Sequence, residues 1–112
     1  MLDLTENQWN NLFDKTDETV QKAIDDLPEE VKKSAEGVSC VVDKYTNEEN
    51  WHMLGCYMQW TNGPIVIYVG QIFEDCNKDI EETMSSVRRV YYHELAHAIG
   101  DLAEYEVKER GL

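Results

Sequence analysis

Hydrophobic residues recur at helical spacing over two long stretches of the chain. The first stretch begins after Thr5, which can cap a helix, and stops before Pro28. Its apolar positions are Trp9, Leu12, Phe13, Val20, Ala23, Ile24 and Leu27. The second stretch covers residues 80–99, with apolar positions at Ile80, Met84, Val87, Val90, Tyr91, Leu95 and Ala98. Both patterns predict long amphipathic helices.

Between these stretches the pattern indicates β-strands. Residues 37–43 contain a run of valines and predict one strand, and residues 54–60 and 65–69 are two further β-type runs. The Asn62-Gly63 pair separates the last two runs and is a strong turn signal, so we expect a hairpin or close strand pair. Polar residues 44–52 predict a loop.

Three short helical segments complete the expected order of elements, at 28–35, 71–76 and 104–110. The 71–76 segment is equally compatible with a turn. A chain of 112 residues is long enough for one modest core, so residues 1–112 are expected to form a single domain. The predicted class is α+β, with a small mixed sheet packed against the long N-terminal helix and the 80–99 helix.

The second long helix carries the pattern His-Glu-x-x-His, formed by His93, Glu94 and His97. Residues four apart lie on one helix face about 6 Å apart along the axis, so both imidazoles can bind a single ion. Glu94 directly follows the first histidine, so its carboxylate lies beside the ion and can take a proton from metal-activated water. The spacing therefore predicts a zinc site with a general base beside it.

A solvated helix face is the alternative reading of the same pattern. The neighbouring residues argue against it, because residues 90–92, 95, 96, 98 and 99 are all uncharged and indicate a mostly buried segment. Burying Glu94 there without a partner would cost several kcal/mol. A bound metal removes this cost, and we therefore favour the metal site.

The net charge of the chain limits which macromolecules it is expected to bind. Lys and Arg total 10 against 23 Asp and Glu, which gives a formal charge of −13. Binding to nucleic acid or to an anionic membrane depends on cations that neutralise phosphates, so neither is expected as a partner. An acidic surface instead suits solubility and cationic substrates.

Cellular location is predicted from the start of the chain and from the cysteines. The first residues lack the basic start and apolar run of a secretory signal, and no stretch approaches the roughly 20 apolar residues that span a bilayer. Cys40, Cys56 and Cys76 are odd in number and widely spaced, which predicts reduced thiols with packing roles rather than disulfides. We therefore expect a cytoplasmic protein. The sequence leaves the oligomeric state open.

The chain resembles the family of small bacterial zincin-like metallopeptidases, which consist of little more than the sheet and active-site helix of larger zincins. The matching segments follow the family order, at 23–31, 53–57, 65–72 and 91–100. The resemblance implies a zincin-like fold, a zinc cofactor and a peptide or protein substrate. It also implies hydrolysis of peptide bonds with Glu94 as the general base.

The third metal ligand is where this sequence departs from the family pattern. The family motif His-Glu-x-x-His-x-x-Gly-x-x-Asp would place an acid at position 103, where this chain has Ala103. Counting back from Gly111 places Glu104 at the corresponding position, after a chain reversal that Gly100 permits. Glu104 is therefore the predicted third ligand. The alternatives are Asp101, Glu106 and, from the 44–52 loop, His52.

Two functions are compatible with these residues. The first is a zinc metallopeptidase with a shallow groove, since the chain is too short for the two lobes of a deep protease cleft. An extended substrate would pair with the 65–69 strand if that strand lies at the sheet edge near the site. The alternative is a catalytically weak or inactive zincin-like domain that binds a metal or a protein partner.

Overall fold

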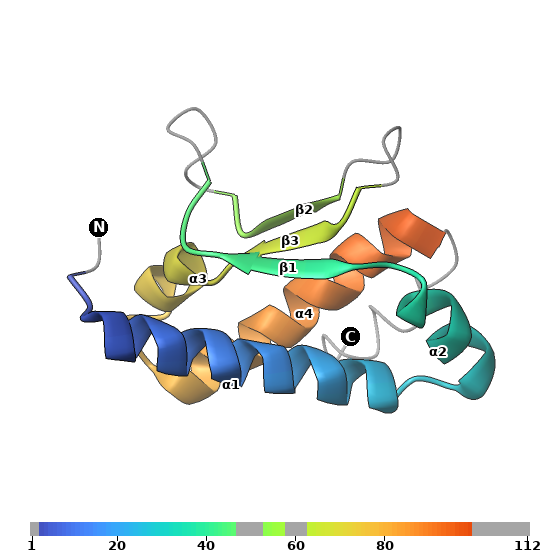
Figure 1. Ribbon diagram of the computed structural model, residues 1–112, viewed down its shortest axis with the longest axis horizontal. Helices are drawn as coiled ribbons and strands as arrows, with labels where there is room; N and C mark the ends of the chain where they lie inside the picture. Colours follow the sequence, from blue (N-terminus) through green and yellow to red (C-terminus); the bar gives the residue numbers. More distant parts are fainter. Residues whose placement is uncertain (1–2, 47–52, 58–62, 100–112) are drawn as a thin grey trace.

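The computed structural model describes residues 3–46, 53–57 and 63–99. Over these residues the protein has a mixed α+β architecture with four helices and one three-stranded sheet (Figure 1). The order of elements is α1 (Glu6–Asp25), α2 (Glu29–Glu36), β1 (Cys40–Asp43), β2 (Gly55–Tyr57), β3 (Ile65–Tyr68), α3 (Val69–Asp75) and α4 (Ile80–Ile99). The predicted α+β class is therefore confirmed.

The two long helices begin where the sequence predicts. Thr5 caps α1 through a reciprocal capping box: its hydroxyl accepts from the Gln8 backbone N–H at 3.2 Å, and the Gln8 side chain accepts from the Thr5 N–H at 2.8 Å. Asp79 caps α4, because its carboxylate accepts from the Glu82 N–H at 2.9 Å. The bounds of α4 coincide with the predicted 80–99 helix.

The sheet has the strand order β1-β3-β2 and is mixed. β2 pairs antiparallel with β3, as predicted, and β1 pairs with β3 in parallel. β3 is consequently the central strand, and the expectation that the 65–69 strand could lie at the sheet edge is wrong. The physical reason is that β1 occupies its second side, and this pairing depends on a crossover that local sequence patterns do not reveal. β2 is the edge strand that lies nearest to α4.

The hydrophobic core lies between the sheet and the helices. Ile65 and Ile67 of β3 are fully buried on the side of the sheet where α1 and α4 pack (Figure 1). Two polar contacts join α4 to the C-terminal end of α1. The Tyr92 hydroxyl donates to the Ala23 carbonyl, and Arg88 forms a 2.9 Å ion pair with Asp26. The helix that carries the His-Glu-x-x-His pattern is thus fixed against both α1 and the sheet.

The shorter elements depart slightly from prediction. α2 ends at Glu36, one residue after the predicted 28–35 segment, with Gly37 as its C-cap. α3 begins at Val69, two residues before the predicted 71–76 segment, because β3 runs directly into it. The first strand starts at Cys40 rather than at residue 37. The predicted 104–110 helix, the Asn62 turn position and most of the 44–52 loop lie outside the described residues. None of the described helices is long and apolar enough to cross a membrane.

Candidate metal centre and adjoining pocket

The His-Glu-x-x-His residues occupy the last turns of α4, on the side away from the core. Tyr91, Tyr92 and Leu95 are at most 1% exposed and pack inward. His93 and Glu94 are half-buried and His97 is exposed. The expectation of a mostly buried segment is therefore wrong for His97, because only one side of a helix can face the core at a period of 3.6 residues. The unfavourable burial of Glu94 is correspondingly smaller than the sequence suggested.

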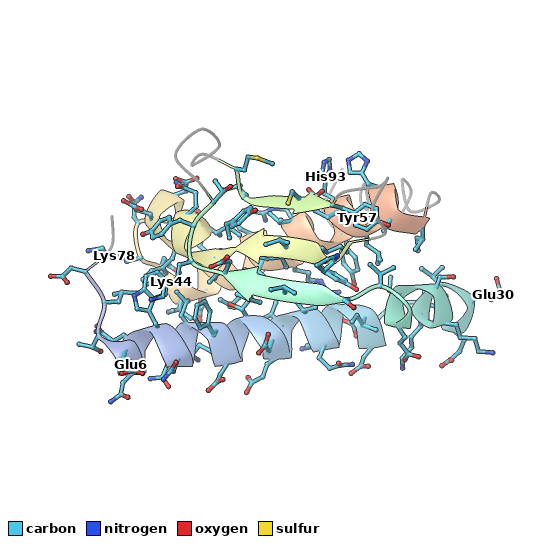
Figure 2. All side chains as sticks on the ribbon, turned by 45° about the horizontal axis from the view of Figure 1, so that its top comes forward. Glu6, Glu30, Lys44, Tyr57, Lys78 and His93 are labelled. Carbon is cyan, nitrogen blue, oxygen red and sulfur yellow. The ribbon has the colours of Figure 1, made fainter. Side chains whose placement is uncertain are left out.

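The two histidine rings lie close together on α4 in an edge-to-face arrangement. Their centroids lie 4.9 Å apart and their planes meet at 85°. With Zn–N bonds of about 2.0–2.1 Å and tetrahedral angles, two imidazoles on one zinc have centroids about 5 Å apart. The spacing of His93 and His97 therefore fits a zinc ion. Figure 2 shows His93 on the β2 side of the molecule.

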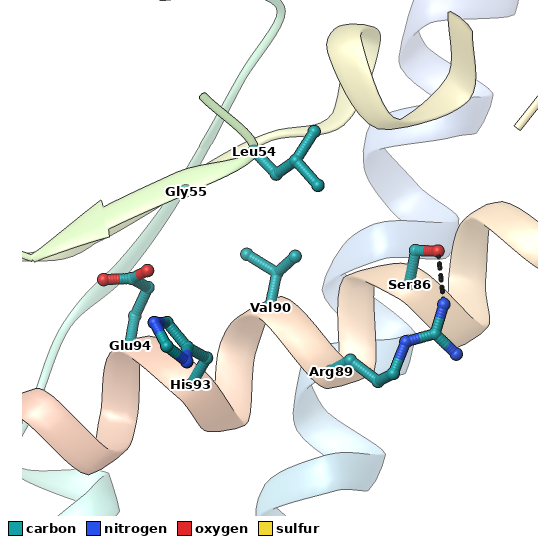
Figure 3. Close-up of a pocket in the computed structure, with 7 residues that line it drawn as sticks. All are labelled: Leu54, Gly55, Ser86, Arg89, Val90, His93 and Glu94. Atoms are coloured by element: carbon teal, nitrogen blue, oxygen red, sulfur yellow. Dashed lines mark hydrogen bonds between the residues drawn. The ribbon is translucent and has the colours of Figure 1, made fainter. Parts of the chain in front are cut away.

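Glu94 faces a pocket between α4 and β2. The pocket has a volume of about 590 Å³, and its lining residues are Leu54, Gly55, Ser86, Arg89, Val90, His93 and Glu94 (Figure 3). Glu94 lies beside His93 at one end of it, as the sequence predicts for a base next to a metal ligand. The open form of the pocket agrees with the expected shallow groove.

Gly55 brings β2 close to the candidate site. A Cβ atom at this position would lie 2.5 Å from Val90 Cγ1, 3.1 Å from the Val66 carbonyl oxygen and 3.5 Å from Glu94 Cγ. Only glycine therefore allows the edge strand to lie this near to α4. The sequence analysis did not identify Gly55, and its only sequence signal is a glycine within a predicted strand.

Arg89 lines the opposite end of the pocket and was also missed. Its guanidinium donates to the Ser86 hydroxyl at 2.9 Å (Figure 3). The sequence signal was the spacing of four between Arg89, His93 and His97, which places all three on one stripe of the helix. The neighbouring Arg88 differs in role, since it pairs with Asp26 and lies over the Tyr92 ring, 5.3 Å from its centroid.

The candidates for the third ligand lie outside the described residues: Glu104, Asp101, Glu106 and His52. Within the described part of the chain, no group of three or more His, Cys, Asp and Glu side chains is arranged to hold a metal. The structure brings His93 and His97 together and places Glu94 beside His93. The third ligand stays a prediction.

Two tyrosines of the motif helix and two of the cysteines, Cys40 and Cys76, belong to the packing of the domain. Tyr91 and Tyr92 are core residues, and burial raises the pKa of the Tyr91 hydroxyl. All three cysteines are free thiols, as predicted. Burial, with a smaller effect of Asp17, raises the pKa of the Cys40 thiol to about 12, so this thiol is a poor metal ligand and nucleophile at neutral pH.

The His93 imidazole and the Glu94 carboxylate thus lie at one end of an open pocket, and the His97 imidazole contacts His93 from one turn further along α4. The imidazoles can bind a divalent cation, and the carboxylate can accept a proton from a group in the pocket. Comparison with known protein families and with curated proteins gives no match for this chain. The chemistry of these residues is therefore the basis for assigning a function.

Proposed function

We propose that this protein is a zinc-dependent metallopeptidase with a minimal zincin-like fold. One observation carries the proposal: the separation of the His93 and His97 rings is compatible with two ligands on one zinc ion, and Glu94 lies beside His93 in a pocket. The resemblance to small bacterial zincin-like metallopeptidases supports the same activity. A mixed sheet packed on a long helix that carries the motif is compatible with that fold.

The residues have separate roles in this proposal. His93 and His97 hold the zinc ion, and Glu104 completes the set of ligands. When bound, zinc supplies Lewis-acid polarisation of the scissile carbonyl and of the attacking water. Glu94 takes a proton from that water and passes it to the leaving amine. Its half-buried position keeps it accessible to both groups.

The peptide would bind along β2. The Tyr68 N–H donates to the Leu54 carbonyl, so the alternation of an antiparallel ladder directs the backbone groups of Gly55 and Tyr57 away from β3. Over the described residues no strand pairs with that side of β2. An extended peptide paired there would pass directly beside Glu94, because Gly55 contacts this part of α4.

Zinc analysis of purified protein tests the metal site. We expect about one zinc per chain, and the His93→Ala/His97→Ala double variant should lose it because both imidazoles of the site are gone. Full zinc occupancy in the double variant would show that the ion binds elsewhere. Glu104→Ala should weaken zinc binding more than Asp101→Ala, Glu106→Ala or His52→Ala does.

Hydrolysis of a peptide library tests the catalytic role. Glu94→Gln should keep its zinc and lose about 10²–10⁴ in rate, which is the usual contribution of a general base. Glu81→Gln, the same change at an exposed position of the same helix, is the matched control and should leave the rate unchanged. Zinc binding without turnover of any peptide by the unmodified protein would favour a non-catalytic metal- or protein-binding domain.

A further inference from the structure

The pocket beside the candidate metal centre has two chemically different ends. Glu94 and His93 form one end, and Ser86 and Arg89 form the other (Figure 3). Along α4 the second end lies one to two turns closer to the N-terminus, at about 6–12 Å from the first. Leu54 and Val90 lie between the two ends and make the middle of the pocket apolar.

Arg89 is positioned by contacts that leave most of its donors available. The Ser86 hydroxyl accepts one N–H of Arg89 at 2.9 Å. The same hydroxyl oxygen lies 3.6 Å from the sulfur of Cys76, the C-cap residue of α3, so Ser86 is itself held in place. A guanidinium has five N–H donors in a fork that matches a carboxylate. Among the described residues no carboxylate forms an ion pair with Arg89, in contrast to Arg88.

Local charge differs from the charge of the whole chain. The formal charge of −13 would repel an anionic peptide at long range. Physiological salt screens exposed charges beyond about 8 Å, so a group inside the pocket responds mainly to its immediate neighbours. Arg89 therefore determines which charge a bound group should carry at this end of the pocket.

We propose that Arg89 is a specificity residue that binds a carboxylate of the peptide, so that the pocket selects substrates with an acidic group separated from the scissile bond by an apolar residue. This inference rests on the proposed peptidase function. An extended peptide advances about 3.3–3.6 Å per residue, so the acidic group lies two or three residues from the cleaved bond. The carboxylate comes either from an Asp or Glu side chain or from the C-terminus of a short peptide.

Three peptide pools separate these two sources. The first two contain amidated decapeptides that are identical except that every Glu of one pool is Gln in the other. The third is the Gln pool with a free C-terminal carboxylate. Arg89 is exposed, so we expect the zinc-loaded protein to cleave one of the two acidic pools about 5-fold faster in kcat/KM than the amidated Gln pool, which is near the upper end for an exposed charge pair.

Arg89 variants show whether this residue causes the preference. Arg89→Gln should bring the pools to within about twofold of one another, Arg89→Lys should restore part of the difference, and Arg89→Glu should disfavour the acidic pool. Lys33→Gln removes the same charge from an exposed position on α2, away from the pocket, and should leave the preference intact. An equal loss on all pools in the Arg89 variants would indicate a structural role and overturn the proposal.

Binding measurements keep this test independent of catalysis. Fluorescence anisotropy of the same labelled pools on zinc-loaded Glu94→Gln protein should show the acidic preference without turnover, and Arg89→Gln should remove it there too. If the unmodified protein cleaves no peptide and the binding preference for an acidic pool is still present, only the proposed peptidase function is refuted. Equal binding of all three pools would refute the role of Arg89, even for an active peptidase.

Discussion

Replacing Gly55 with alanine tests the close approach of β2 to α4. The added Cβ would lie 2.5 Å from Val90 Cγ1, whereas carbon atoms pack best at about 3.5–4.0 Å. The overlap of about 1.0–1.5 Å is difficult to relieve, because a valine in a helix has one strongly preferred rotamer. The other route is a shift of β2, which over the described residues is a short strand, Gly55–Tyr57, paired with β3. Overpacking of this kind costs about 1–3 kcal/mol.

Urea denaturation followed by circular dichroism measures this loss directly. We expect the free energy of unfolding to fall by about 1–3 kcal/mol with an unchanged urea slope, and the melting temperature to fall by about 4–12 °C. Gly37→Ala is the matched control. A Cβ there would meet only the Ser34 carbonyl oxygen, at 3.4 Å, and its helical φ of −79° suits alanine. That variant should be unchanged or more stable by up to about 1 kcal/mol.

A double-mutant cycle with Val90→Ala assigns the loss to one contact. In the Val90→Ala background the Gly55→Ala penalty should drop by at least about 1 kcal/mol, leaving the 3.1 Å contact with the Val66 carbonyl oxygen as the main residual effect. Two results would refute this reasoning. One is a Gly55→Ala protein within about 0.5 kcal/mol of the unmodified chain. The other is an undiminished penalty in the Val90→Ala background.

Two further predictions concern the attachment of α4 and the behaviour of the protein at high pH. Tyr92→Phe removes the donor to the Ala23 carbonyl and should lower the free energy of unfolding by about 1–2 kcal/mol in urea denaturation; no change would show that the hydroxyl does not stabilise the α1–α4 contact. The Cys40 thiol has a pKa raised from 9.0 to about 12, so the folded protein keeps a proton that the unfolded chain loses. Its contribution to stability is complete below pH 9 and decreases as the pH rises toward 12. Between pH 8 and pH 10.5 the free energy of unfolding should therefore fall less for Cys40→Ala than for the unmodified protein. Equal falls would show that Cys40 does not cause this pH dependence.

The sequence predicted the elements that depend on local patterns. The bounds of α4 followed from its apolar period, and the β2–β3 pair followed from two β-type runs with an Asn-Gly turn signal between them in the sequence. The central position of β3 could not be predicted in this way. It depends on parallel pairing of Val41 with Val66 across a long connection, which leaves no short-range signal.

The candidate site could also be predicted only in part, namely where its residues lie on one helix. His93, Glu94 and His97 share one helix, so spacing alone places them together. Gly55 enters the site through the packing of β2 against α4, which is a tertiary contact, and the same packing turns the helix stripe that carries Arg89 into one wall of a pocket. The exposure of His97 likewise depends on which side of α4 meets the core, and uncharged neighbours gave a misleading indication of it.

The location of the motif at the C-terminal end of α4 has an electrostatic consequence. His97 lies in the last described turn of α4, at the end of the helix dipole that carries about half a negative charge. The backbone of α4 therefore attracts a divalent cation toward the two imidazoles before any acidic ligand contributes. The same partial charge opposes an oxyanion on this side of the pocket. In the proposed peptidase reaction, donors to a negatively charged transition state would accordingly come from the cation or from the β2 backbone across the pocket, and not from the backbone of this end of α4.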